Sequence, residues 1–196
     1  FTYLNKEIRK IPHKFIVDKK IPFYKSLTEY ESFSDKFEKI EIDKNTKAMV
    51  TFTDGSAGEP KIISKTHEFL LNQQEVLKKI LDIDKDSKVL VILPTFLLSN
   101  ISSGITSIVP EISLKTSEDI DGNIIINQIK NENIDTIIAP PAFFNPFIEI
   151  YEAIGRNIHN IKKVYTGGTP VFPLFLESLK KVFPYAEIKS IYASLE

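Results

Sequence analysis

Short apolar runs alternate with amphipathic segments along most of the chain, and this rhythm begins near residue 46. The apolar runs predict buried strands at 48–53, 88–93, 112–114, 135–139, 163–166 and 187–192. Between them, the sequence predicts helices at 66–81, where the apolar residues form one stripe, and at 100–109, 123–131, 142–154 and 172–183. Strands that alternate with helices favour an α/β fold, in which a mostly parallel sheet is flanked by helices on both faces.

Residues 1–45 do not show this rhythm. Ile11-Pro12 and Ile21-Pro22 interrupt runs of mixed charge, which predicts loops and short helices, with one helical piece at 34–40. We therefore expect two parts. Residues 1–45 form a lead-in segment, the end of an upstream part, and residues 46–196 form an α/β nucleotide-binding subdomain.

Composition excludes several classes of function. A hydrophobic content of 42% is enough to bury a sizeable core. Lys and Arg number 25 against 26 Asp and Glu, and no basic cluster stands out, which gives no support for nucleic-acid binding. The chain has no cysteine, so disulfides and thiolate metal sites are excluded. Its three histidines lie far apart in the sequence, which argues against a metal site made of histidines.

The sequence also lacks the usual targeting signals. No basic segment followed by a long apolar run opens the chain, so no signal peptide is expected. The longest apolar-leaning stretch, 89–109, contains proline, serine, asparagine and glycine, whereas a membrane span needs about 20 mainly apolar residues. We therefore expect no membrane span and a soluble, cytoplasmic protein.

A stretch rich in glycine and hydroxyl groups follows the strand expected at 48–53. It reads Thr53-Asp54-Gly55-Ser56-Ala57-Gly58-Glu59-Pro60-Lys61 and precedes the helix expected at 66–81, for which Thr66 is the expected N-cap. Glycines let backbone N–H groups approach an anion, and lysine supplies a positive charge. The stretch therefore predicts a phosphate-binding loop, although its spacing is not that of a Walker loop. An ordinary glycine-rich turn is the alternative for so short a motif.

Small or polar residues also follow the other expected strands. They are Pro94-Thr95-Phe96-Leu97, Pro140-Pro141, Thr166-Gly167-Gly168-Thr169-Pro170 and Tyr192-Ala193-Ser194-Leu195-Glu196. In doubly wound sheets, ligands bind beyond the carboxyl ends of the strands. We therefore expect a binding site where these segments meet.

Taken in order from about Ala48 to Glu196, these motifs resemble the AMP-forming acyl and aryl synthetases, the adenylate-forming superfamily, within its large N-terminal domain. The stretch 53–61 resembles the phosphate loop of that family, and Lys65-Thr66-His67 resembles the Thr/Ser-His that opens its next helix. Residues 167–170 resemble its Gly-Gly-Ala-Pro turn, which lies against adenine. Residues 192–196 resemble its Tyr-Gly-x-Thr-Glu motif.

The resemblance implies ATP or AMP and Mg²⁺ as cofactors. Nucleotide binding is implied for Thr53, Asp54, Gly55, Ser56, Ala57, Gly58, Lys61, Gly168, Thr169, Pro170 and Tyr192, and Mg²⁺ binding for Glu196. It also implies that a carboxylic acid is activated to an acyl-adenylate and then passed to a thiol of CoA or a carrier protein. The family's ribose-binding Asp and C-terminal lid would follow Glu196, so catalysis is expected of a longer ligase and not of these residues alone.

Several residues depart from the family's pattern. Leu195 replaces the phosphate-binding Thr and has no hydrogen-bond donor in its side chain, Asp54 adds a negative charge to the loop, and Ala57 replaces Thr. Leu97 stands where many members have a gating His or aromatic residue. These departures keep an alternative open, a degenerate adenylation fold that acts as a nucleotide-binding or scaffold module without catalysis. A further alternative is an α/β nucleotide-binding domain unrelated to the synthetases.

Three other groups of residues are interpreted as structural. His67 is expected to be a polar residue at a helix start, because no partner acid or nucleophile is evident. Phe143, Phe144 and Phe147 are expected in the core and not in an acyl pocket. Asp82, Asp84 and Asp86 lack the Gly and Glu of a calcium-binding loop and predict a polar connection between helix and strand.

Overall fold

The computed structural model describes residues 6–17, 25–26, 40–53, 61–111 and 120–192. The chain divides into two units, Phe1–Ile42 and Asp43–Glu196. In the first unit, the described elements are helix α1 (Lys6–Lys10) and two short parallel strands, β1 (Phe15–Ile16) and β2 (Lys25–Ser26). Residues 34–39, most of the helical piece expected there, lie outside the described part of the chain.

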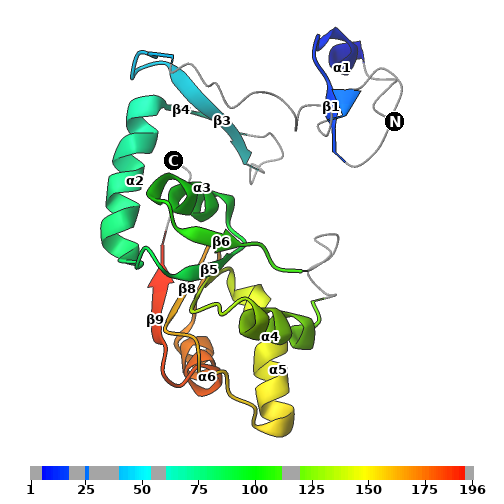
Figure 1. Cartoon of the computed structure of the whole chain (residues 1–196), viewed down its shortest axis with the longest axis vertical. Coiled ribbons are helices and arrows are strands. Elements are labelled where there is room, and N and C mark those ends of the chain that lie inside the picture. The colour runs from blue at the N-terminus through cyan, green and yellow to red at the C-terminus, as the bar shows by residue number, and fades with distance from the viewer. Residues whose placement is uncertain (1–5, 18–24, 27–39, 54–60, 112–119, 193–196) are drawn as a thin grey trace. The chain divides into compact units, whose positions relative to one another are not determined.

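A five-stranded parallel sheet forms the centre of the second unit (Figure 1). Its strands are β5 (Lys88–Val91), β6 (Thr106–Ile108), β7 (Thr136–Ala139), β8 (Lys163–Gly167) and β9 (Glu187–Ile191). They lie in the order β6-β5-β7-β8-β9, and every pair is parallel. The expected parallel sheet is confirmed.

Helices cover both faces of this sheet (Figure 1). One face packs against α4 (Gly122–Asn131), α5 (Asn145–Ile154) and α6 (Pro173–Val182) through a cluster that includes Leu90, Ile137 and Val164. The other face packs against α2 (His67–Leu81) and α3 (Pro94–Ser103) through Val89, Val91, Ile138 and Tyr165. Successive strand residues point to opposite faces, which is why both sets are apolar and the inner strands β5 and β7 are mostly apolar and buried.

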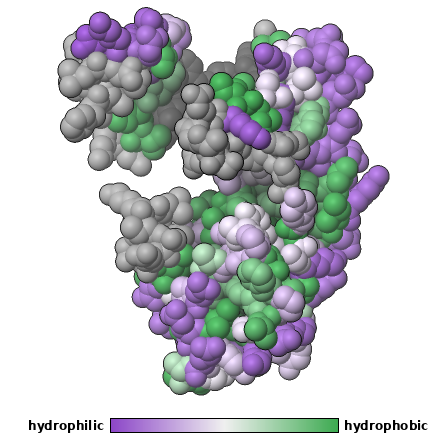
Figure 2. All heavy atoms as spheres, turned by 180° about the vertical axis from the view of Figure 1, so that it is seen from behind, coloured by the Kyte–Doolittle hydropathy of each residue, from purple (hydrophilic) through white to green (hydrophobic). Residues whose placement is uncertain are grey.

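The strand expected at 48–53 is present, but it does not belong to the parallel sheet. It is β3 (Lys47–Thr53), and it pairs antiparallel with β4 (Lys61–Thr66), a strand that the sequence pattern did not reveal. The isoleucines of β4 favour extended backbone. Large apolar side chains reach the surface of this unit, as the green areas of Figure 2 show, and on the hairpin they include Val50, Phe52 and Ile62.

The prediction of a helix at 100–109 is wrong. The chain forms α3 earlier, at Pro94–Ser103, and then strand β6. Pro94 suits the first turn of a helix because its fixed φ is already helical and its missing N–H is not needed there. Gly104 ends the helix with φ at 70°, a conformation that glycine adopts without steric cost. The β-branched residues after it continue as a strand.

The remaining expected elements agree with the structure to within about two residues, except that the helix expected at 142–154 is divided. A 3₁₀ turn at Pro141–Phe144 precedes α5. The strand expected at 112–114 lies outside the described residues. Phe143, Phe144 and Phe147 are fully buried and stack edge-on or tilted against one another, which confirms them as core.

Candidate functional site

A cavity of about 320 Å³ opens at the carboxyl edge of the parallel sheet. Four strands border it near their ends, through Leu93, Ile138, Thr166–Gly168 and Ile191. The first turn of α3 adds Pro94, Thr95 and Phe96, α2 adds Gln73 and Leu77, and β4 adds Lys65. Its volume is at the lower end of the roughly 300–1,000 Å³ typical of small-molecule sites. The expectation that 94–97 and 166–170 meet at one site thus holds for Pro94–Phe96 and Thr166–Gly168.

The turn after β8 brings backbone to the cavity. A Cβ built on Gly167 would overlap the carbonyl oxygen of Ile191, so the close pairing of β8 and β9 requires glycine there. Gly168 has φ at 87°, again a glycine conformation, and lines the cavity. Thr169 and Pro170 follow it and are exposed. These residues are therefore accessible to a ligand at the sheet edge.

The other residues named for nucleotide binding are spread over three places. Tyr192 directly follows Ile191 of the cavity wall and is 97% exposed. Thr53 and Lys61 pair with each other across the hairpin, and Lys61 does not border the cavity. Residues 54–58 and Glu196 lie outside the described part of the chain. The described structure therefore brings Gly168 and Tyr192 to one edge of the sheet and leaves Lys61 on the hairpin.

Thr166 carries a polar group without a hydrogen-bond partner. Its side chain is 1% exposed, and its Oγ1 is one of two buried side-chain oxygens in the described residues that make no hydrogen bond, the other being Oγ1 of Thr51. Such groups are rare in native proteins because burial without a partner costs about 1–3 kcal/mol. Since Thr166 also borders the cavity, a ligand there is a candidate partner for its hydroxyl.

Tyr165 is buried beside Thr166 and has a structural role. Its hydroxyl donates a hydrogen bond to the carbonyl oxygen of Leu81, the last residue of α2. Burial, and then the negative charges of Glu187 and Asp82, raise the pKa of Tyr165 to about 12. The phenol therefore stays protonated at neutral pH and ties α2 to the sheet, while the ring lines the cavity.

Lys65 places a cationic side chain on the cavity wall. It is 3% exposed, and its Nζ lies 5.1 Å from the centre of the Phe69 ring. Within the described ranges, no hydrogen bond or ion pair joins this ammonium to another group. Sequence reasoning named Lys65 only as part of a motif and missed its place in the site. The available signal was that Lys65 and Ile63 share one side of β4.

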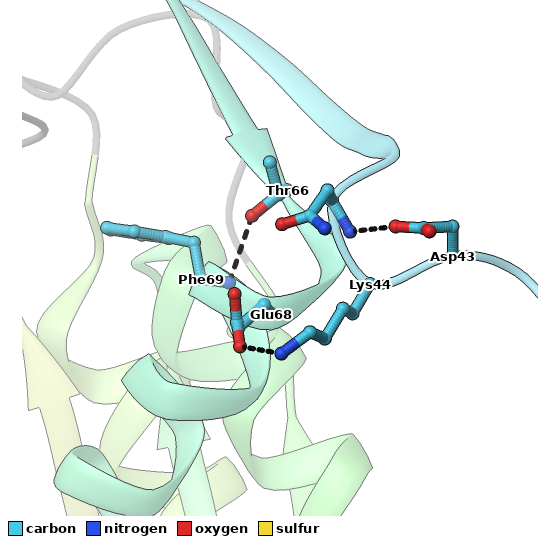
Figure 3. Close-up of polar contacts among 6 residues, drawn as sticks. Asp43, Lys44, Thr66, Glu68 and Phe69 are labelled. Atoms are coloured by element: carbon cyan, nitrogen blue, oxygen red, sulfur yellow. Dashed lines mark hydrogen bonds and ion pairs between the residues drawn. The ribbon is translucent and has the colours of Figure 1, made fainter.

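The start of α2 holds Phe69 in place (Figure 3). Thr66 caps the helix, as expected, by accepting a hydrogen bond from the Phe69 backbone N–H at 3.2 Å. Glu68 pairs with Lys44 at 2.8 Å, and this hydrogen bond and charge raise the pKa of Lys44. The carboxylate of Glu68 is therefore engaged by a lysine other than Lys65.

The described residues contain no group of three or more His, Cys, Asp or Glu side chains placed to hold a metal ion. None of their helices has both the length and the apolar content that a membrane crossing requires. Asp82 ends α2 and begins the polar connection to β5, as its sequence suggested.

Comparison with known proteins points to one family. The family model described as AMP-binding enzyme matches residues 4–196. Olefin beta-lactone synthetase from Xanthomonas campestris pv. campestris is 23% identical over 137 residues, which cover 70% of this chain and 24% of that protein. The 2-succinylbenzoate–CoA ligase of Staphylococcus aureus is 23% identical over 134 residues, 67% of this chain and 26% of that protein. The chain thus spans about a quarter of the length of these relatives.

Solved structures show the same fold. The luciferase-like enzyme of the mealworm Zophobas morio matches with a TM-score of 0.79 and 17% identity, covering 97% of this chain and 45% of that one. A long-chain-fatty-acid-CoA ligase from Archaeoglobus fulgidus matches with a TM-score of 0.68 and 20% identity, covering 85% of this chain and 35% of that one.

Proposed function

Because the chain belongs to the AMP-binding enzyme family, we propose that the whole protein activates a carboxylic acid with ATP. A carboxylate oxygen of the acid attacks the α-phosphorus. The bond from this phosphorus to the bridging oxygen breaks, and pyrophosphate leaves with the electron pair. The product is an acyl-adenylate. The sulfur of a thiol of CoA or a carrier protein, having lost its proton, attacks the acyl carbon, and AMP leaves with the electron pair of the broken bond.

The cavity at the sheet edge is the observation that carries this proposal. Its wall is mostly apolar, with Leu77, Leu93 and Phe96 among its residues, and so it suits the body of an organic acid. The exposed turn 168–170 and the exposed ring of Tyr192 stand at the same edge, where an adenine ring needs flat, accessible neighbours. The reacting carboxylate would then lie between the cavity and the adenine ring, at the rim near Thr166.

The phosphates are assigned to the hairpin. Thr53 and Lys61 border the glycine-rich stretch, whose backbone N–H groups and hydroxyls suit an anion. Magnesium would offset negative charge on the phosphates as the reaction proceeds. The described residues do not form a metal site, and Glu196 lies outside them, so no step is assigned to a metal ligand.

ATP–pyrophosphate exchange by the whole protein, measured with a panel of carboxylic acids, tests the proposal. Exchange should require an acid. Thr95→Trp, which narrows the cavity, should raise KM for the acid at least 10-fold and leave KM for ATP within about 3-fold. Ile101→Trp is the matched control, because Ile101 lies on the same helix, is exposed and does not border the cavity. Absence of acid-dependent exchange across the panel would show that the protein does not catalyse this reaction.

The second candidate is a degenerate adenylation fold that acts, without catalysis, as a scaffold or as a weak nucleotide-binding module, and Asp54 and Leu195 motivate it. In that case the protein should bind ATP weakly or not at all, and no acid should support exchange. Leu195→Thr together with Asp54→Ser should then raise the affinity for ATP in the presence of Mg²⁺ by 10-fold or more. An unchanged affinity would argue against a decayed site.

A further inference from the structure

Lys65 is a buried cation in a mostly apolar wall. Lysines are almost never fully buried unless they are paired, because removing the ammonium from water is costly. Among the described residues, its recorded partner is the face of Phe69. A cation over an aromatic ring gains about 0.5–2 kcal/mol, which offsets only part of the desolvation. The cavity therefore holds a positive charge that is not neutralised by the described residues.

Among the described residues, neighbouring groups do not supply the missing anion. Glu68, the acidic residue nearest in the sequence, pairs with Lys44. The polar side chains that share the cavity wall with Lys65 are Gln73, Thr95, Tyr165 and Thr166, and all four are neutral. The hydroxyl of Tyr165 is already bonded to the carbonyl of Leu81. A negatively charged group on a ligand in the cavity would complete the pairing of Lys65.

We propose that Lys65 binds a second anionic group on the acid, so that the substrate is a dicarboxylic acid, with one carboxylate reacting and the other held by Lys65. This inference rests on the proposed function. The apolar wall residues Leu77, Leu93 and Ile138 would contact the hydrocarbon that joins the two carboxylates. A cavity of about 320 Å³ suits a short linear or single-ring diacid.

The position of Lys65 on β4 separates it from the reacting end of the acid. Lys61 begins the strand at the glycine-rich stretch, and Lys65 lies four residues further, about 13 Å along an extended strand. The proposed phosphate site is thus at the far end of β4 from Lys65. In addition, pairing with a lysine would lower the nucleophilicity of the reacting carboxylate. At a carboxylate that does not react, this loss of nucleophilicity does not slow the reaction.

The test uses the whole protein and pairs of acids that differ only in the second carboxylate, such as adipate with hexanoate and phthalate with benzoate. Loss of one charge-assisted hydrogen bond corresponds to about 10- to 100-fold. The wild-type protein should therefore prefer the diacid of its best pair by at least about 10-fold in kcat/KM. Lys65→Met should lower kcat/KM for that diacid by this factor and leave the matched monoacid within about 3-fold.

Three variants complete the design. Lys79→Met removes an exposed lysine from α2 and should change kcat/KM neither for the diacid nor for the monoacid. Lys65→Arg keeps the charge and should keep the preference for the diacid. Lys65→Glu reverses the charge and should favour an acid with a terminal ammonium group, such as 6-aminohexanoate. The melting temperature of ligand-free Lys65→Met should stay close to that of the wild-type protein, since the loss of the contact with Phe69 is offset by the relief of desolvation of the ammonium.

The outcomes separate this inference from the proposed function. Equal use of diacids and monoacids, or an equal loss on both in Lys65→Met, would overturn the role of Lys65 and leave acid activation intact. If no acid supports exchange, the proposed function fails. Calorimetry of diacid binding without ATP then tests whether Lys65 binds an anion. Binding that Lys65→Met weakens at least 10-fold would keep the anion site, and binding that is absent or unchanged would overturn it.

Discussion

Two buried threonines in neighbouring strands should respond to the same substitution with opposite signs. Thr136 in β7 and Thr166 in β8 are both 1% exposed. The hydroxyl of Thr136 donates a hydrogen bond to Oδ1 of Asp135 at 2.9 Å, whereas that of Thr166 has no partner. Valine has nearly the shape of threonine without the hydroxyl. Thr166→Val should therefore stabilise the ligand-free protein, and Thr136→Val should destabilise it.

The magnitudes follow from the state of each hydroxyl. A buried hydroxyl without a partner costs about 1–3 kcal/mol, so we expect Thr166→Val to stabilise by about 1 kcal/mol after some relaxation. The hydrogen bond of Thr136 is made to a carboxylate that is 18% exposed, and its loss should destabilise by about 1–2 kcal/mol. The two variants should thus differ by about 2–3 kcal/mol.

Thermal melting of the whole protein without ligand measures the two effects. A change of 1 kcal/mol shifts the melting temperature of a 150–250-residue domain by about 2–4 °C. Thr166→Val should raise the melting temperature of the transition that contains this domain by that amount, and Thr136→Val should lower it by about 2–8 °C. Binding provides a second readout, because a ligand that uses the hydroxyl of Thr166 should bind Thr166→Val about 3- to 10-fold more weakly.

A loss of stability in Thr166→Val as large as that in Thr136→Val would refute this reasoning. It would mean that the hydroxyl of Thr166 has a partner in the intact protein, and the hydroxyl would then not be available to a ligand. If Thr166→Val is more stable but binds the ligand as well as the wild-type protein does, the hydroxyl destabilises the ligand-free protein and does not contact the ligand.

Three further substitutions test the parts of the fold that position the site. Gly167→Ala should destabilise by more than about 3 kcal/mol, because its Cβ would overlap the carbonyl oxygen of Ile191, whereas Gly104→Ala, strained only by its φ of 70°, should cost about 1 kcal/mol in the same denaturation assay. Tyr165→Phe should remove part of the alkaline unfolding of the protein. The raised pKa means that the folded state holds the phenolic proton more tightly, so this contribution to stability is complete below pH 10 and is lost as the pH rises towards about 12. Phe144→Ala should lower the unfolding free energy by about 3–5 kcal/mol and leave the KM for an acid substrate unchanged, because Phe144 is buried in the core away from the cavity.

Periodicity predicted most of the parallel sheet because burial on both faces makes each of its main strands an unbroken apolar run. The strands β5, β7 and β8 are of this kind, and their expected positions are confirmed. The second strand of the hairpin was not predicted, since three of the six residues of β4 are exposed and the strand mixes isoleucine with serine and lysine. Its antiparallel partner lies before the glycine-rich stretch, so the connection runs from strand to strand and not from strand to helix.

The misplaced helix α3 shows how local signals compete. The sequence pattern predicts a helix at 100–109, but Pro94 begins the helix earlier and Gly104 ends it. A proline in the first turn and a glycine in the left-handed conformation act through backbone geometry, which hydrophobic periodicity does not register. The shift matters for function because it brings the first turn of α3, with Thr95 and Phe96, to the cavity wall.

The candidate site likewise contains residues that the sequence reveals and residues that it does not. Motif resemblance located the turn at Gly168 because its role depends on backbone conformation, and a backbone conformation requires particular residues at fixed spacing. The side of the cavity formed by Lys65, Gln73 and Leu77 has no such requirement. A side chain there contributes through its charge and size alone, and its position follows from how β4 and α2 pack, which a linear pattern does not record. The residues proposed to choose the substrate are therefore those least visible in the sequence, and Lys65 is the clearest case because a buried charge is the costliest feature to retain without a ligand.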